Sequence, residues 1–241
     1  MRSPEVTVVM SVYNGTGALD GTLASLMAQS GCDFEVVAID DGSTDGSGPL
    51  LDAWAAREPR MRVIHQPNQG LTRALMLGCR EARGEFIARQ DVGDASLPGR
   101  LAAQAELLRT QPSLVFVACR HELVGPCCEP LGVAPGHEAA PAEGLRNRDG
   151  RVLPNPAHGS VMFRKSAYVA AGGYRPEFYF AQDVDLWSRL IAQGDFDYVP
   201  QPLYQVKVDL HGISAHHREA QQRLRALVAE GAALRRAGGS E

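Results

Sequence analysis

The chain has 241 residues, of which 44% are hydrophobic and 22% are charged, and its formal net charge is −4. This composition is typical of a globular protein with one large α/β domain or two small ones, and the acidic balance predicts no nucleic-acid partner. Five cysteines without a CxxC pair, and no apolar run near the ~20 residues that span a bilayer, predict a cytoplasmic protein, at most peripheral at the inner face of a membrane.

Strands and helices alternate through the first half of the chain. Apolar runs and apolar residues at three- and four-residue spacing predict strands at 6–10, 34–39, 62–64, 85–89 and 114–118, and helices at 19–27, 50–57 and 71–82. A further helix is predicted to begin at Leu97-Pro98, because proline is tolerated in the first helical turn. A strand, a helix and a second strand within about 35 residues form a βαβ unit, which implies parallel strands and a right-handed crossover.

The second half of the chain is less regular. Residues 125–155 are rich in Pro, Gly, Ala and charge without a sustained period, and we expect a long irregular segment there. Beyond it, the pattern predicts strands at 159–163, 196–199 and 203–208, and helices at 166–171, 183–192 and 217–236. The last helix carries arginines that could touch an anionic membrane surface, although scattered arginines on a helix are usually only solvated.

Acidic side chains follow three of the apolar runs: Asp40 with Asp41, Asp91 with Asp94, and Asp183 with Asp185. The first two pairs end predicted parallel strands, so the topology should bring them to one crevice at the carboxyl edge of the sheet. Clustered acids repel one another, and a divalent cation with a diphosphate ligand would relieve that cost. From spacing alone, the pair at 91 and 94 fits a solvated turn that caps the next helix equally well.

Several short blocks occur along the chain in a fixed order, at 11–15, 37–45, 68–71, 84–91, 97–101, 158–163 and 181–187. Together they resemble the family-2 glycosyltransferases of the GT-A fold, over roughly residues 5–214. The resemblance implies an α/β fold with a mostly parallel mixed sheet flanked by helices. It also implies a catalytic domain over 1–214, with the irregular segment on its acceptor side and a C-terminal helix over 215–241.

The activity implied by this resemblance is an inverting transfer of a sugar. The donor would be a nucleotide diphosphate sugar, UDP-linked by expectation, and the acceptor a glycan or a lipid-linked sugar of polysaccharide or cell-envelope biosynthesis. The residues that the resemblance assigns to the nucleotide are Ser11, Tyr13, Asn14, Asp41 and Asp91, with Tyr13 near the base and Asp41 accepting from its ring N–H. Arg73 could meet phosphate, or it could be part of a solvated helix face.

The resemblance places a divalent cation, Mn²⁺ or Mg²⁺, at Asp91 and Asp94, with His211 near the cation or the diphosphate. One departure affects this half of the site. Family members usually carry an acid where this chain has Gly93, so metal binding is expected to be weakened unless Asp94 substitutes. Two smaller departures are Gln182, in place of the acid before the base, and Met76, where relatives often carry Asn.

Asp183 would be the general base in this family. A sugar hydroxyl is a poor nucleophile, so a carboxylate within hydrogen-bond reach must take its proton as the new bond forms. The predicted helix N-terminus favours the ionised carboxylate, but a plain N-cap would use the same residue. Before it lies an aromatic run that could stack on an acceptor sugar or pack in the core; it comprises Tyr174, Phe178, Tyr179 and Phe180.

Two other functions remain open from the residues alone. A sugar nucleotidyltransferase shares a related sheet, but the loop at 11–17 lacks the Lys and Arg that such an enzyme needs there. A non-catalytic nucleotide-binding protein with a degenerate metal motif is compatible with Gly93 and Gln182.

Overall fold

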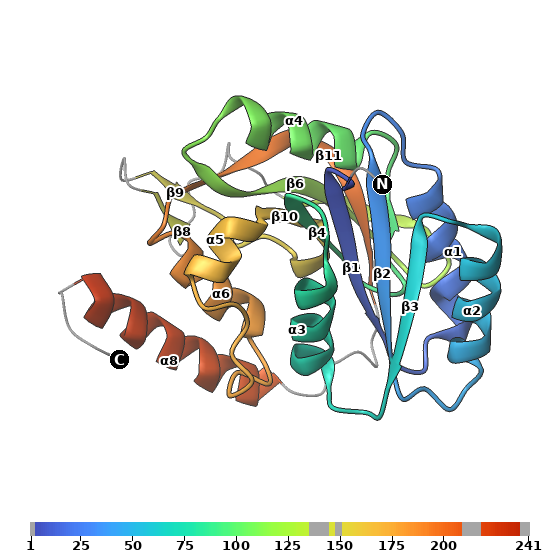
Figure 1. Ribbon diagram of the computed structural model, residues 1–241. Helices are drawn as coiled ribbons and strands as arrows, with labels where there is room; N and C mark the ends of the chain where they lie inside the picture. Colours follow the sequence, from blue (N-terminus) through green and yellow to red (C-terminus); the bar gives the residue numbers. More distant parts are fainter. Residues whose placement is uncertain (1–2, 135–144, 148–150, 209–217, 237–241) are drawn as a thin grey trace.

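The computed structural model describes residues 3–134, 145–147, 151–208 and 218–236 (Figure 1). In the first half of the chain, four parallel strands pair in the order β3-β2-β1-β4, with β1 and β2 in the middle. The strands are β1 (Val6–Val12), β2 (Phe34–Asp41), β3 (Met61–Gln66) and β4 (Phe86–Gln90), and the connecting helices are α1 (Thr16–Met27), α2 (Ser47–Arg57) and α3 (Leu71–Glu81). The predicted βαβ organisation of this half is confirmed.

The second half extends the same sheet with strands of mixed direction. From β4 the order continues through β10, β6, β11 and β5, of which only β6 and β11 pair in parallel, and β7 pairs with β6. These strands are β5 (Ala95–Ser96), β6 (Leu114–Val124), β7 (Pro130–Val133), β10 (Val161–Arg164) and β11 (Asp195–Lys207). The remaining elements are β8 (Leu145–Arg146), β9 (Val152–Leu153), the 3₁₀ turn η1 (His158–Ser160), α4 (Arg100–Thr110), α5 (Lys165–Ala170), α6 (Gln182–Leu190) and α8 (Arg218–Arg236).

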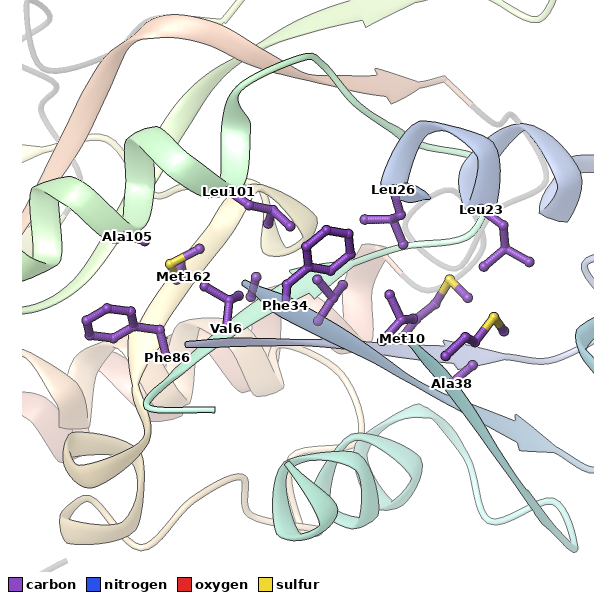
Figure 2. Packing of buried hydrophobic residues seen from close by; sticks show 14 of the residues in the cluster. Val6, Met10, Leu23, Leu26, Phe34, Ala38, Phe86, Leu101, Ala105 and Met162 are labelled. Atoms are coloured by element: carbon purple, nitrogen blue, oxygen red, sulfur yellow. The ribbon is translucent and has the colours of Figure 1, made fainter. Parts of the chain in front are cut away.

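Helices cover both faces of the sheet. Alternate side chains of β1 pack into two separate cores, because successive residues of a strand point to opposite faces. Val8 and Met10 face α1, α2 and α4, and this core is shown in Figure 2. Val9 faces α3, α5 and α6 on the other side. With both faces covered, β2 is buried at each of its positions, as expected for a central parallel strand.

The helix expected at Leu97-Pro98 begins later than predicted, at Arg100. The N–H of Leu97 donates to the carbonyl of Leu203 at 2.9 Å, so the preceding residues form β5 against β11 instead of a helical turn. Gly99 then turns the chain into α4 with a φ of +84°, a conformation that glycine adopts without steric cost.

The expectation of an irregular segment over 125–155 is wrong for its described part, which contains β7, β8 and β9. All of β7 is exposed, so no burial imposes an alternating pattern on its sequence. The two strands expected near the end of the sheet form one strand, β11, whose register against β6 shifts on both sides of Pro202. Proline cannot donate to a strand ladder, which explains why the sequence indicated a break there.

The C-terminal helix α8 packs against α6 and extends from one side of the molecule (Figure 1). On α8, Val228 is buried, whereas Leu227 and Leu234 are exposed. No helix in the described part of the chain combines the length and the apolar character needed to cross a membrane.

Candidate functional site

Asp41, at the carboxyl end of β2, is almost fully buried and holds the turn that precedes α3. Its Oδ1 accepts hydrogen bonds from Gln66 Nε2 at 2.6 Å and from the backbone N–H of Gln69 at 2.9 Å. Its Oδ2 accepts from the N–H of Gly70 at 2.8 Å. The side chain predicted to read the base is therefore also a structural anchor, with 1% of its surface exposed.

The loops after β1 and β2 are joined by short polar contacts. Asn14, at a φ of +52°, donates its N–H to Ser43 Oγ at 3.1 Å, and its Oδ1 accepts from the N–H of Thr44 at 2.8 Å. Asp45 accepts hydrogen bonds from Ser47 and Thr16, which hold the pKa of its carboxyl well below the ordinary value. The two loops therefore act as one rim at the edge of the sheet.

The other residues assigned to the nucleotide lie around this rim. Ser11 pairs with Ile39 in the β1–β2 ladder, and Tyr13 follows β1 with 56% of its surface exposed. Arg73 is exposed near the start of α3. The fold thus brings Ser11, Tyr13, Asn14 and Asp41 to one edge of the sheet, while Arg73 extends from the neighbouring helix.

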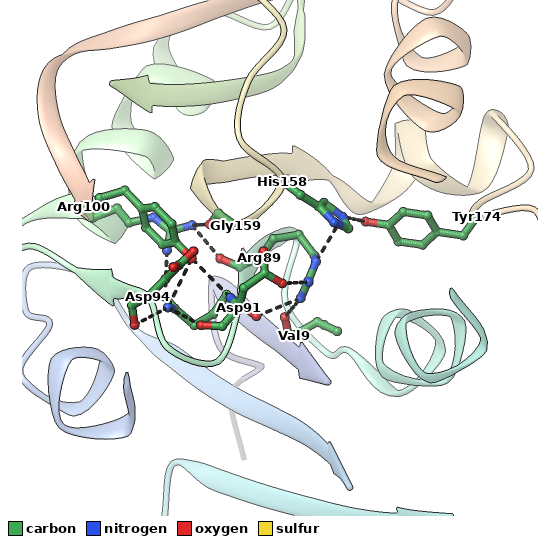
Figure 3. Close-up of polar contacts among 10 residues, drawn as sticks. Val9, Arg89, Asp91, Asp94, Arg100, His158, Gly159 and Tyr174 are labelled. Atoms are coloured by element: carbon green, nitrogen blue, oxygen red, sulfur yellow. Dashed lines mark hydrogen bonds and ion pairs between the residues drawn. The ribbon is translucent and has the colours of Figure 1, made fainter. Parts of the chain in front are cut away.

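Asp91 lies at the end of β4 and forms an ion pair with a fully buried arginine (Figure 3). Arg89 Nη2 donates to Asp91 Oδ1 at 2.7 Å, and the other guanidinium nitrogens donate to the carbonyls of Val9 and Gln90 and to His158 Nε2. The Asp91 side chain is 37% exposed, and a Cβ built on Gly159 would lie 3.0 Å from its Oδ2. One carboxylate oxygen is thus committed to Arg89, and the other faces Gly159.

Asp94 is held in place by a backbone contact. Its Oδ1 accepts the N–H of Lys207 at 3.0 Å, which ties the end of β11 to this turn. Burial, together with the negative charge of Asp91, raises the pKa of Asp94 to about 7. Between the two acids, Gly93 has a φ of +98°, and a Cβ built on it would meet no atom within 4 Å.

These residues fit only a weakly held cation. In the described part of the chain, no group of three or more His, Cys, Asp and Glu side chains could hold a metal ion. Mg²⁺ and similar ions can be bound through one or two carboxylates plus the phosphates of a substrate, and Asp91 Oδ2 offers one such ligand. His211 lies outside the described residues.

A second buried arginine, Arg100, holds the backbone beside the turn at 91–94. No role for it was predicted from the sequence. Its guanidinium donates to the carbonyl oxygens of Arg89 and Gly159, each at 2.7 Å, and to Ser96 Oγ at 2.8 Å. It also lies over the ring of Tyr204, 4.7 Å from the centroid. The available signal was its place in the family block at 97–101, directly after the Leu97-Pro98-Gly99 turn.

His158 connects the metal half of the site to the second half of the chain (Figure 3). Its Nε2 lies 2.7 Å from the hydroxyl of Tyr174 and 3.3 Å from Nε of Arg89. Burial, reinforced by the charge of Arg89, lowers the pKa of His158 to about 4, so the ring is neutral near pH 7. Since the arginine can only donate, Nε2 is an acceptor and Nδ1 carries the proton. Sequence reasoning assigned no role to His158, although it begins one of the family blocks.

The two acids in the first turn of α6 have different environments. Asp185 is fully buried and paired with Arg175 and Arg189, so its role is structural. Asp183 is partly exposed, and within the described chain no hydrogen bond or ion pair holds its carboxylate. The residue before the helix, Ala181, has a φ of +60°, which turns the aromatic run sharply into α6. Gln182 is buried beside it.

The aromatic run itself is divided between core and surface. Tyr174 is buried against His158, whereas Tyr179 is 55% exposed. Phe178 and Phe180, which flank Tyr179 in the sequence, are partly buried.

Comparisons with known proteins agree with this arrangement. Glycosyl transferase family 2 matches residues 7–169 of the chain. The putative glycosyltransferase EpsE of Bacillus subtilis (strain 168) is 31% identical over 223 residues, which cover 86% of this chain and 74% of that protein. Chondroitin synthase of Escherichia coli is 26% identical over 203 residues, covering 84% of this chain and 29% of the synthase.

Solved structures confirm the fold. S. aureus TarS 1-349 in complex with UDP-GlcNAc superposes with a TM-score of 0.76 at 18% identity, covering 93% of this chain and 65% of that chain. The mannosyltransferase PcManGT from Pyrobaculum calidifontis, in complex with GDP-Man and Mn²⁺, superposes with a TM-score of 0.70 at 19% identity, covering 97% of this chain and 65% of that one. This chain therefore spans just under two thirds of both structures. The mixed, mostly parallel sheet flanked by helices is the GT-A fold, and the chain belongs to glycosyl transferase family 2.

Proposed function

We propose that this chain transfers a hexose, with inversion, from a nucleotide diphosphate sugar to a glycan or a lipid-linked acceptor. The observation that carries the proposal is the uncommitted carboxylate of Asp183 in the first turn of α6. In the same turn, Asp185 is locked in a buried ion pair. A carboxylate that no partner in the described chain holds and that is partly exposed is accessible to an acceptor hydroxyl, as a general base must be.

In this proposal, the acceptor hydroxyl donates a hydrogen bond to Asp183 and loses its proton to it as the hydroxyl oxygen attacks the anomeric carbon. The nucleoside is held by Ser11, Tyr13, Asn14 and Asp41, and its diphosphate lies toward Asp91. A divalent cation, when bound, would supply positive charge to the departing diphosphate without a proton transfer.

We assign Mn²⁺ or Mg²⁺ as a cofactor that this chain holds weakly. Asp91 would be its main ligand, with Asp94 and His211 as further candidates and Arg73 as a candidate phosphate contact. The complex of PcManGT with GDP-Man and Mn²⁺ supports a cation of this class. Gly93 supplies no ligand atom, so the diphosphate would provide much of the coordination.

A UDP-linked donor is the form that we propose. The complex of TarS with UDP-GlcNAc supports it, whereas that of PcManGT shows that a GT-A neighbour binds GDP-Man. A panel of both nucleotide sugars, assayed by release of UDP or GDP, distinguishes the two.

The test of the base is Asp183→Asn. We expect donor turnover to fall by at least 100-fold, with UDP affinity in calorimetry close to that of the wild type, because general-base catalysis contributes typically 10²–10⁴-fold. The matched control is Glu177→Gln, which removes an exposed acid from the preceding loop and should leave turnover intact. Full activity of Asp183→Asn would refute the assignment.

A second candidate function, nucleotide binding without transfer, rests on Gly93 and Gln182. Calorimetry of UDP with and without Mn²⁺ separates the two functions. Tighter UDP binding with metal, together with turnover of a nucleotide sugar, supports the transferase, whereas binding without turnover of any donor in the panel supports the second function.

We also propose that α8, as part of an appended segment over 215–241 beside a catalytic domain over 1–214, contacts a membrane surface. Its exposed Leu227 and Leu234 lie on a helix with five Arg and two Glu, which suits an anionic lipid surface. Flotation with phosphatidylglycerol-rich vesicles should carry the protein, and Leu227→Ser with Leu234→Ser should abolish this. Equal flotation of the variant would argue against the contact.

A further inference from the structure

Two tyrosines have more than half of their surface exposed in the structure: Tyr13 at 56% and Tyr179 at 55%. The other four are buried. Tyr13 follows β1 and is already assigned to the nucleoside. Tyr179 comes from the loop between α5 and α6, far along the chain, and no role of the site so far uses it.

Tyr179 rests on the turn that Asp41 anchors. A Cβ built on Gly70 would lie 2.7 Å from Tyr179 Cε2 and 2.9 Å from its hydroxyl oxygen. These separations are too short for non-bonded atoms, so the Tyr179 ring would have to shift if position 70 carried a side chain. The N–H of this same Gly70 donates to Asp41 Oδ2.

The loop that carries Tyr179 is tied to α3 by a hydrogen bond and has a ring contact within itself. Thr72, which is 2% exposed, donates its hydroxyl to the carbonyl of Phe178 at 3.2 Å. The ring of Phe180 meets that of Tyr179 edge-on, with centroids 5.1 Å apart at 89°. In Figure 1 the loop between α5 and α6 descends beside α3, which begins at the anchored turn.

The hydrogen bonds of Asp41 indicate where a base would lie. A carboxylate has about four acceptor positions, two on each oxygen. Among the described residues, Gln66 and Gln69 fill both positions of Oδ1, and Gly70 fills one of Oδ2. A ring N–H that donates to Asp41 must use the remaining position on Oδ2. This oxygen also accepts from Gly70, the residue against which Tyr179 lies.

We infer that Tyr179 is a nucleoside-binding residue, whose ring stacks on the base of a pyrimidine nucleoside diphosphate donor. The inference rests on the proposed function and extends its donor site to the second half of the chain. Tyr179 supplies an aromatic surface for the base in addition to Tyr13. Stacking on an aromatic side chain needs the ring and not the hydroxyl, which sets the design of the test.

Calorimetry with UDP, uridine and inorganic pyrophosphate tests the inference. Tyr179→Ala should weaken the binding of UDP and of uridine by about 10-fold and leave that of pyrophosphate unchanged, since base stacking is lost. Tyr179→Phe should bind all three like the wild type. Glu177→Ala, an exposed neighbour in the same loop, is the matched control and should change none of the affinities.

Fluorine NMR of protein labelled with 3-fluorotyrosine provides a readout that is independent of affinity. Saturating UDP should shift the resonances of Tyr13 and Tyr179, assigned through the Phe variants, and leave the four buried tyrosines nearly unmoved.

Three outcomes would overturn the inference. These are an unmoved Tyr179 resonance, UDP affinity unchanged in Tyr179→Ala, or an equal loss for UDP and pyrophosphate. An increased KM for a sugar acceptor at unchanged UDP affinity would instead place Tyr179 on the acceptor side. If the wild-type protein binds neither UDP nor GDP, the proposed function fails together with the inference. If the wild-type protein binds UDP and Tyr179→Ala binds UDP equally well, the inference fails and the proposed function stands.

Discussion

Gly93 is the residue at which this chain departs most from a metal-binding turn. Its positive φ is the conformation that Asn and Asp tolerate best after glycine, and the space around it is open. Gly93→Asp restores an acid in this open space, with the backbone strain that any side chain meets at this φ. We expect Mn²⁺ to tighten UDP binding by about 10-fold more in this variant than in the wild type, the effect of roughly 1.4 kcal/mol of additional coordination.

Gly93→Asn is the matched control for this prediction, because it has the same shape and backbone strain without the charge. Calorimetric titration of UDP with Mn²⁺ and with EDTA gives the coupling for all three proteins. If Asp and Asn variants respond equally to Mn²⁺, position 93 does not contribute a ligand.

His158 predicts a specific dependence of stability on pH. The folded protein lowers its pKa from 6.5 to about 4, so between these values the unfolded chain binds more protons. Stability contributed by neutral His158 is therefore complete above pH 6.5 and lost as the pH falls toward 4, with a slope of at most about 1.4 kcal/mol per pH unit.

His158→Gln keeps an acceptor oxygen for Arg89 and Tyr174 but cannot titrate. Urea unfolding at several pH values between 7 and 4 should show a shallower loss of stability for this variant. His65 also affects stability in this range, in the opposite direction, because Asp40 and Asp52 raise its pKa. This contribution to stability is the same in both proteins, so the difference between them reports His158. Identical slopes would contradict the prediction.

At the scale of elements, the turn between β3 and α3 depends on one carboxylate. Asp41→Asn replaces one acceptor oxygen by an NH₂ group that cannot accept, so either the part-buried N–H of Gln69 or the buried N–H of Gly70 loses its partner. Such a loss costs about 1–3 kcal/mol of folding free energy. Hydrogen exchange should speed up at the amides of the turn, and the midpoint of urea unfolding should fall.

Asp52→Asn is the control for this variant, since Asp52 is an exposed acid on the neighbouring helix α2. It should leave both measurements nearly unchanged, because exposed ion pairs contribute little. Protection of the turn that survives Asp41→Asn would show that other contacts hold it.

The elements of the first half could be predicted because each has one period of apolar residues that face a core. β2 has an apolar run at 36–39 and is buried throughout, and the leucines of α1 recur at helical spacing, so local pattern and tertiary position agree. The short strand β5 could not be predicted, since its residues pair only because Leu97 meets Leu203 across the fold. The strand β7 could not be predicted either, because all of its residues are exposed and show no alternation.

The residues of the candidate site were predictable to different degrees. Strand ends and family blocks located Asp41, Asp91 and Asp183. The sequence pattern does not indicate which of their carboxylate oxygens already accept hydrogen bonds from the protein. The pairing of Asp91 with Arg89 and the anchoring of Asp94 by Lys207 arise from contacts distant in sequence. Their predicted roles toward nucleotide and metal stay predictions.

For the whole molecule, Arg100 is the side chain that joins the two halves of the sheet. Its guanidinium holds the carbonyls of Arg89 on β4 and of Gly159 in η1, so Arg100→Met leaves both buried oxygens unpaired. A buried acceptor that loses its donor costs about 1–3 kcal/mol. We expect a loss of this size in urea unfolding, without a change in the order of the elements.

Arg109→Met, at an exposed position on the same helix, is the control and should unfold close to the wild-type midpoint. A small effect of Arg100→Met would mean that the pairing of β4 with β10 and the apolar cores hold the two halves of the sheet together without this side chain.

The hydrogen bond between Thr72 and Phe178 has a consequence for the order of events during turnover. It ties the start of α3, on the donor side, to the loop that leads into α6 and Asp183. We therefore expect a bound donor to stabilise this loop. The kinetics should then be compulsory-ordered, with the sugar nucleotide binding first and the nucleoside diphosphate leaving last. Such an enzyme is inhibited by UDP competitively against the donor and non-competitively against the acceptor.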